Sequence, residues 1–175
     1  MCPESATAAC YGERMRRALQ TKTITVPGNL RIACDQFNSH QFFECHESFE
    51  EIWQEEISDV RDLYKGLIQI AAAYVHITRG NFVGADRLLR TGVGYLAPYR
   101  AEGAMGFDVE RICRAAERQH AVLLADGPGH VVFDPAKVPL YEFEADCLQA
   151  EALRWRAWGF DREGSAAEME ITVAE

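Results

Sequence analysis

The sequence predicts an all-α fold, a single domain in which four to five helices form an irregular bundle built on an antiparallel helical hairpin. Three observations predict this class. Apolar residues recur at helical spacing in several segments between residues 38 and 158. Residues that start and end helices bracket these segments. No segment alternates apolar and polar residues strongly enough to predict a sheet.

The chain is expected to begin with a partly flexible arm at residues 1–29, which includes a short arginine-rich helical stretch at 5–20. The helical domain then extends over residues 30–160. Asn38 is a good N-cap, and Gln41 three residues later completes a capping-box pattern, which predicts a first helix that ends near Glu56.

The second helix is expected to run from Asp59 or Asp62 to Arg79, where the Gly80-Asn81 pair stops it. A third covers 82–90, because the glycines at 92 and 94 and the proline at 98 should break or loosen the helix beyond that point. Asp108 caps a fourth that reaches Leu124. Residues 130–141 are expected to be extended, 142–158 to form a last helix, and 161–175 to be a flexible acidic tail.

Composition narrows the class of partner. The net charge is -9, and the 18 basic residues are scattered among 27 acidic ones without forming a basic stripe, so no nucleic acid and no membrane surface is expected to bind. The longest nearly apolar stretch, 67–75, is too short to span a bilayer. A homodimer, a protein partner or a small-molecule substrate of unknown identity is compatible with the sequence.

The cysteines and the N-terminal residues predict the cellular compartment of the protein. Six cysteines occur without a C-x-x-C pair, and the first twenty residues lack the pattern of a secretory signal. We therefore expect a cytoplasmic protein whose reduced thiols pack as small apolar residues. Cys45 in particular lies beside His46 in sequence, but consecutive helical residues diverge by about 100°, so the two side chains should not meet.

The most unusual segment is FFECHESFEEIW at 42–53. On a helix His46 lies within an apolar stripe, and Glu50 lies one turn further on. The pattern H-E-x-x-E resembles the zinc-protease motif, in which residues at i and i+4 hold a metal and the residue after the first ligand activates water. A divalent metal (zinc, iron or manganese) would then be bound by His46, Glu50 and, from the second helix, His76, with Glu47 as catalytic base.

The same residues allow two other interpretations. In one, the cluster is a structural latch, with His46 held in the core by Glu50 or by a group on the second helix, and with Glu47 and Glu51 paired with basic residues such as Arg61. The domain would then be a non-catalytic helical interaction module. In the other, the cluster carries out acid–base chemistry without a metal. The residues alone leave the three open.

The chain resembles the family known as domain of unknown function 309. The matching residues are Phe37-Asn38, then F-F-E-x-H-E-x-x-E-x-x-W at 42–53, Y-x-G-L-I-Q-x-A-A-A at 64–73, His76, and G-N-x-x-G-A at 80–85. The resemblance covers about 33–95 and continues more weakly to about 125, which makes 33–125 the family-like core. It implies a small all-helical domain, sometimes labelled a predicted metal-dependent hydrolase. That label rests on the same histidines and glutamates.

Overall fold

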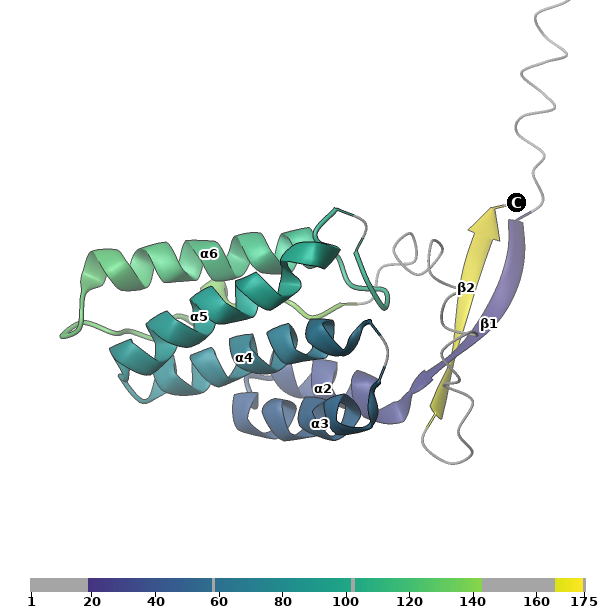
Figure 1. Cartoon of the computed structure of the whole chain (residues 1–175), viewed down its shortest axis with the longest axis horizontal. Coiled ribbons are helices and arrows are strands. Elements are labelled where there is room, and N and C mark those ends of the chain that lie inside the picture. The colour runs from purple at the N-terminus through teal and green to yellow at the C-terminus, as the bar shows by residue number, and fades with distance from the viewer. Residues whose placement is uncertain (1–18, 58, 102, 143–165, 175) are drawn as a thin grey trace, which may run out of the picture.

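The computed structural model describes residues 19–57, 59–101, 103–142 and 166–174. Its α-helices are α2 (Gly28–Asn38), α3 (Phe42–Glu55), α4 (Arg61–Thr78), α5 (Phe82–Leu96) and α6 (Val109–Asp126). Two short 3-10 helices, η1 (Ala97–Tyr99) and η2 (Pro135–Lys137), and two strands, β1 (Leu19–Pro27) and β2 (Ala166–Ala174), complete the described elements. The helices form one bundle around one hydrophobic core, which confirms the predicted all-α class (Figure 1).

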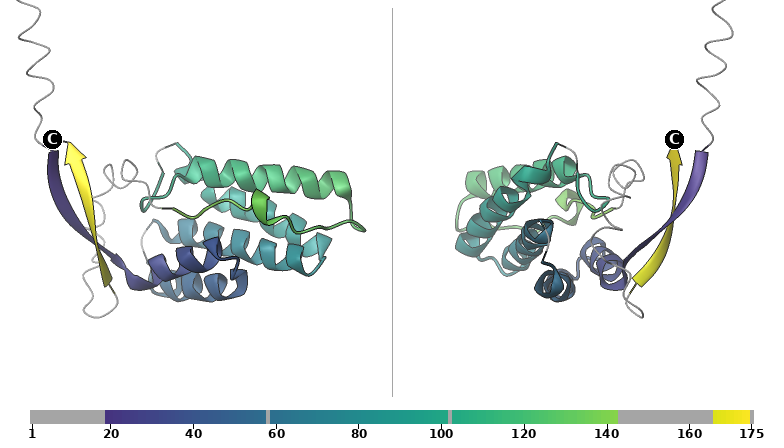
Figure 2. Two further views of the ribbon diagram at one scale, coloured as in Figure 1. Left: turned by 180° about the vertical axis from the view of Figure 1, so that it is seen from behind. Right: turned by 45° about the vertical axis from the view of Figure 1, so that its right-hand side comes forward.

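Helices α3, α4 and α5 follow one another as neighbours, with α2 against α3 and α6 against α5 (Figure 1). Short connections join α2 to α3, α3 to α4 and α4 to α5, as expected for antiparallel helical hairpins. Residues after α6 return across the bundle on the side seen in the left view of Figure 2. Helix α4 is the central helix of the row, because it contacts both α3 and α5 along its length.

The helix α2 was not predicted, and the role given to Asn38 was wrong. Asn38 is the last residue of α2, and α3 begins at Phe42 after Gln41, whose side chain makes no capping bond. The Asn38 side chain instead binds the backbone of Tyr141 twice, donating to its carbonyl at 3.0 Å and accepting from its N–H at 2.8 Å. Asparagine favours helix caps, but here its side chain holds the backbone of residue 141 against the end of α2.

The predicted end of the third helix was also wrong, because α5 continues through Gly92 to Leu96. The reason is the close contact between α4 and α5. A Cβ atom on Gly92 would lie 2.9 Å from Cγ1 of Ile70, and one on Gly66 would lie 2.6 Å from Cγ of Leu96. These glycines therefore let two helices approach closely, and the packing compensates for their low helix propensity.

Local signals predicted other boundaries correctly. Helix α4 ends at the predicted place, and Gly80 follows it with φ +67°. Asp108 caps α6 by accepting a hydrogen bond from the N–H of Arg111 at 2.9 Å, and Gly127 follows α6 with φ +75°. Both glycines have a positive φ, which commonly ends a helix.

The structure adds a sheet that was not expected. β1 and β2 pair antiparallel over nine residues each, from Leu19 opposite Ala174 to Pro27 opposite Ala166 (Figure 1). The expectation that no sheet forms was wrong, because the pairing joins segments near the two ends of the sequence and local alternation does not reveal such a contact. The helical stretches expected at 5–20 and 142–158 lie almost wholly outside the described residues.

Ala71 and Ala73 of α4 are fully buried within the bundle and are therefore not available to contact a second copy. Of the helices in the described ranges, none combines the length and apolar composition needed to cross a bilayer.

Tyr141 anchors the segment that crosses the bundle. Its ring is 1% exposed and stacks on Phe37 with centroids 3.7 Å apart and planes 2° apart. Its hydroxyl donates to the carbonyl of Leu67 at 3.2 Å. The segment 131–141 is thereby fixed to both α2 and α4.

Candidate functional site

The predicted site residues lie along one side of α4 and on the flank of α3 that faces it. Four half-buried residues of α4 recur at i, i+4, i+7 and i+11, which places them in one stripe: Lys65, Gln69, Ala72 and His76. Lys65 contacts Trp53 of α3, and Gln69 accepts a hydrogen bond from Thr91 of α5. The stripe therefore runs between α3 and α5. We call this stripe of four residues the α4 face.

On α3, His46 and Glu50 are brought together but are not hydrogen-bonded. The closest approach joins Nδ1 of His46 to Oε2 of Glu50 at 3.8 Å, with side chains 31% and 40% exposed. This is longer than a normal hydrogen bond. His46 Nδ1 is nevertheless buried and has no hydrogen-bond partner. The pair is thus an ion pair when the imidazole is protonated, on the edge of the core.

His76 is fixed at the other end of the α4 face by Asn81. Its Nδ1 lies 2.8 Å from Nδ2 of Asn81, while Oδ1 of the same amide accepts the N–H of Gly84 at 3.0 Å and so caps α5. Because the amide nitrogen can only donate, Nδ1 of His76 must accept. The neutral imidazole consequently carries its proton on Nε2, which is then a donor.

The space beside His76 is set by Gly84. A Cβ atom at this position would lie 2.5 Å from Nδ1 of His76 and 2.6 Å from its Cγ. Such distances are far inside van der Waals contact, so the imidazole can rest against α5 only because residue 84 is a glycine. The backbone N–H of Asn81 also donates to the carbonyl of His76 at 2.9 Å.

The glutamates on the outer side of α3 do not make the contacts with basic residues that the latch interpretation predicted. Glu51 accepts a hydrogen bond from Nδ2 of Asn29 at 2.9 Å, and Glu47 is exposed. Arg61 donates to the carbonyls of Trp53 and Glu56 and lies 4.0 Å above the Trp53 ring. Arg61 therefore fixes the end of α3 rather than a glutamate of its middle turns.

The geometry does not assemble the predicted metal ligands. Over the described ranges, no three His, Cys, Asp or Glu side chains are grouped so that they could hold a metal ion. His46 and Glu50 are adjacent, whereas His76 is bound to Asn81 through Nδ1. In this conformation the residues do not fit a three-ligand metal centre.

Two polar contacts between α5 and its neighbours were not predicted. The Nε2 atom of His120 on α6 lies 2.7 Å from Oδ1 of Asp86 on α5, with side chains 22% and 28% exposed. The second contact is the hydrogen bond from Thr91 to Gln69. Each pair joins residues more than twenty positions apart, and the sequence carries no local spacing signal for such a contact.

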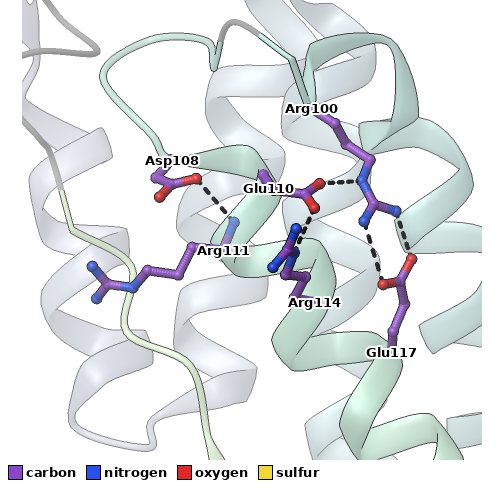
Figure 3. A network of polar contacts seen from close by, with 6 residues as sticks. All are labelled: Arg100, Asp108, Glu110, Arg111, Arg114 and Glu117. Carbon is purple, nitrogen blue, oxygen red and sulfur yellow. Dashed lines mark hydrogen bonds and ion pairs between the residues drawn. The ribbon is translucent and has the colours of Figure 1, made fainter.

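A denser ionic network joins the start of α6 to the turn after α5 (Figure 3). Arg100 contacts Glu110 and Glu117, and Arg114 donates to Glu110 at 2.6 Å. Hydrogen bonds from Arg100 and then Arg114 lower the pKa of Glu110 to about 2. All four side chains are salt-bridged among themselves, so the network ties Arg100, in the turn after α5, to the first half of α6.

The cysteines of the bundle are packing residues, as predicted for Cys45. Cys34, Cys45 and Cys113 are buried free thiols. Burial raises the pKa of Cys34 and Cys45 far above the usual range, and raises the pKa of Cys113 to about 11. Thiols that stay protonated are poor nucleophiles and poor metal ligands.

Comparison with known proteins confirms the resemblance. Residues 30–88 match the family model of a domain of unknown function, DUF309. The uncharacterized protein YpuF of Bacillus subtilis (strain 168) is 40% identical over 76 residues, which are 42% of this chain and 44% of that protein. The alignment thus spans less than half of the relative's length. No solved structure matches the chain. The family match covers α2 to α4 and the first half of α5, and so includes the α4 face.

Proposed function

We propose that this protein, whose residues 30–88 match the DUF309 family, is a non-catalytic helical interaction module in which the polar α4 face is a structural latch. The observation that carries the proposal is the contact of His76 with Asn81. One amide side chain caps α5 through its oxygen and binds α4 through its nitrogen. The histidine that a metal site would need is used to lock the helical hairpin.

The contacts of the α4 face support the same conclusion. Gln69 and Thr91 bind each other between α4 and α5, and Trp53 lies under the cations of Arg61 and Lys65 between α3 and α4. These polar groups of α4 thus each have a partner on a neighbouring helix. Such contacts fix the register of the helices and favour one arrangement of the bundle over others.

A double-mutant cycle tests the latch. Asn81→Ser keeps a capping oxygen for α5 but has no second polar group for His76, whereas Asn81→Ala removes both functions, so the two variants separate the cap from the contact with His76. Combined with His76→Ala, we expect a coupling energy of about 0.5–1.5 kcal/mol between positions 76 and 81 in urea unfolding of the full chain. Additive effects of the two substitutions would refute the latch.

A metal-dependent hydrolase is the second candidate, and the state of His46 favours it. Its Nδ1 is buried without a hydrogen bond, and a carboxylate of Glu50 lies 3.8 Å away. Such a centre would take His46, Glu50 and His76 as ligands of zinc, iron or manganese, with Glu47 as the base, and would require the Asn81 amide to reorient so that Nδ1 of His76 donates and Nε2 is free to bind the metal.

Metal analysis separates the two candidates. Under the latch proposal, protein purified without chelator contains no stoichiometric zinc, iron or manganese, and none of these ions raises its melting temperature. A stoichiometric metal that is lost in both His46→Ala and His76→Ala, but retained in a matched His130→Ala variant at an exposed position, would overturn the proposal.

A further inference from the structure

Tyr141 fills a slot that other elements of the bundle build. The segment that carries it belongs to no helix and crosses the bundle on the side seen in the left view of Figure 2. The slot is formed by α2, α3, α4 and the connection just before α6. We define it by the five residues that contact Tyr141: Phe37, Asn38, Phe49, Leu67 and Phe107.

The chain that fills the slot is extended. Residues 138–142 form neither helix nor strand. Their side chains alternate, since Pro139 and Tyr141 are buried whereas Leu140 and Glu142 are exposed. Such alternation is typical of an extended chain that lies with one side on its support. The segment is therefore held as a receptor holds an extended peptide, through alternate side chains.

Asn38 recognises the backbone of this segment rather than a side chain. Its amide nitrogen donates to the carbonyl of residue 141 at 3.0 Å, and its amide oxygen accepts the N–H of the same residue at 2.8 Å. A carboxamide supplies both a donor and an acceptor, so it replaces the pair of bonds that a neighbouring antiparallel strand would make. The contact is available to any extended residue except proline, whichever chain carries that residue.

The interior of the slot favours a tyrosine. The ring stacks on Phe37 with centroids 3.7 Å apart, and the hydroxyl donates to the carbonyl of Leu67 at 3.2 Å. A phenylalanine would keep the stacking but lose this hydrogen bond, and a small side chain would leave a cavity between the aromatic rings. Next to the slot, Oε2 of Glu142 lies 2.8 Å from Nη2 of Arg111. An acidic residue directly after the tyrosine thus also has a partner.

The slot and the segment that fills it differ in their relation to the family. All slot residues except Phe107 lie within residues 30–88, which match the family model, whereas Tyr141 lies outside the match. The connection from α6 also permits the segment to leave. Gly127 ends α6 with φ +75°, and residues 128–130 are exposed. Detachment of the segment therefore requires no helix to unwind.

We propose that the slot is the docking site of the interaction module. Its partner is an extended segment of another protein, in which a tyrosine is followed by an acidic residue. Residues 138–142 occupy the slot in the same way and compete with the partner. Because they belong to the same chain, they have a high effective concentration and keep the slot closed until the partner exceeds it.

This inference deepens the proposed function and rests on it, since it names the class of partner that the module binds. The slot includes neither His76 nor Asn81. Peptide binding can therefore fail while positions 76 and 81 remain coupled, and a metal bound at His46 and His76 would overturn the latch without removing the slot.

A labelled peptide with the sequence of residues 133–142 tests the proposal by fluorescence anisotropy on the full chain. Tyr141→Phe removes the bond to Leu67 and so weakens the competing segment, and this variant should bind the peptide about five-fold more tightly than the wild type. Tyr141→Ala empties the slot and should bind more tightly still. The peptide should also raise the melting temperature of Tyr141→Ala, a measurement that works even if this variant is unstable alone.

Variants of the peptide and of the slot measure specificity. A peptide with phenylalanine in place of its tyrosine should bind Tyr141→Ala about five-fold more weakly, and one with alanine should not bind. Adding Asn38→Ala to Tyr141→Ala removes two hydrogen bonds and should weaken binding by at least about ten-fold. Ser39→Ala, at the exposed next position, is the matched control and should have no effect.

Two results would overturn the proposal. One is that neither Tyr141→Phe nor Tyr141→Ala binds the peptide more tightly than the wild type does. The other is that the tyrosine and alanine peptides bind Tyr141→Ala equally well, because the peptide would then adhere to an exposed core without recognition of its tyrosine.

Discussion

Removal of the Tyr141 side chain should be among the most destabilising single changes outside the helices. The ring is 1% exposed, stacks on Phe37 at 3.7 Å, and meets the edges of Phe49 at 5.9 Å and Phe107 at 6.2 Å. Truncation of a buried aromatic to alanine costs about 3–5 kcal/mol through lost transfer energy and a residual cavity. We expect Tyr141→Ala to fall in that range.

The two contributions of the side chain can be separated. Tyr141→Phe keeps the ring and removes only the hydrogen bond to the carbonyl of Leu67, which should cost about 1 kcal/mol. Tyr141→Leu keeps apolar volume and loses the stacking on Phe37, and should give an intermediate value. The difference between the Phe and Ala variants then measures packing, at about 2–4 kcal/mol.

Urea unfolding of the full chain, followed by circular dichroism, measures these differences at constant m-value. Tyr95→Ala is the matched control, because that tyrosine is 38% exposed on α5 and should cost much less. If Tyr141→Ala costs no more than Tyr95→Ala, then the 131–141 segment is not fixed to the bundle and the reasoning fails. Because Tyr141→Phe should stay folded, the test remains informative even if the alanine variant unfolds.

Three further changes test other contacts of the bundle. Gly84→Ala should destabilise by about 1–3 kcal/mol in urea unfolding because its Cβ meets the ring of His76 at 2.5 Å, whereas Gly94→Ala, with nothing within 4 Å, should stabilise by about 0.5–1 kcal/mol; equal effects would contradict this. The pKa of Glu110 is lowered to about 2, so its contribution to stability is present above pH 4.5 and is lost as the pH falls from there, and Glu110→Gln should flatten that part of an acid titration of the urea midpoint. The pKa of Cys113 is raised from 9.0 to about 11, so the contribution of this buried thiol to the free energy of unfolding is fully present below pH 9 and decreases as the pH rises toward 11. Cys113→Ala should reduce this decrease in a titration of the urea midpoint.

Local chemistry made the middle of the fold predictable. Asp108 caps the start of α6, and Gly80 follows the end of α4 with a positive φ. Both effects are local, so these helix ends could be predicted without knowing which helices pack together. Asn38 shows the limit of such signals. Its side chain is equally suited to a cap and to a clamp on the backbone, and the clamp is 103 residues away in sequence. The decision between the two is made by tertiary packing.

Gly92 shows the same limit in another way. In isolation a glycine lowers helix propensity, which is why an early end of α5 is expected from the sequence. The close approach to Ile70 reverses the conclusion, because only a glycine leaves room for it. The ribbon is the extreme case, since the pairing of residues 19–27 with 166–174 depends on where the bundle places both ends of the chain.

The candidate site was predictable in the parts that lie on one helix. His46 and Glu50 are one turn apart, and the structure places them 3.8 Å apart. His76 was correctly assigned to the neighbouring helix, but its contact with Asn81 was not foreseen. That contact depends on the orientation of an amide that caps the next helix, and the capping oxygen leaves only the nitrogen for the imidazole.

The extent of the family match has a consequence for how function should be tested. Residues 30–88 contain the whole α4 face, but they end inside α5 and omit α6. The slot occupied by Tyr141 is built from matched residues such as Phe37, whereas Tyr141 itself lies outside the match. A fragment limited to the match would therefore expose the aromatic core that Tyr141 covers, and exposed core binds nonspecifically. Metal uptake or partner binding is meaningful for this protein only when measured on the full chain, with Tyr141 in place.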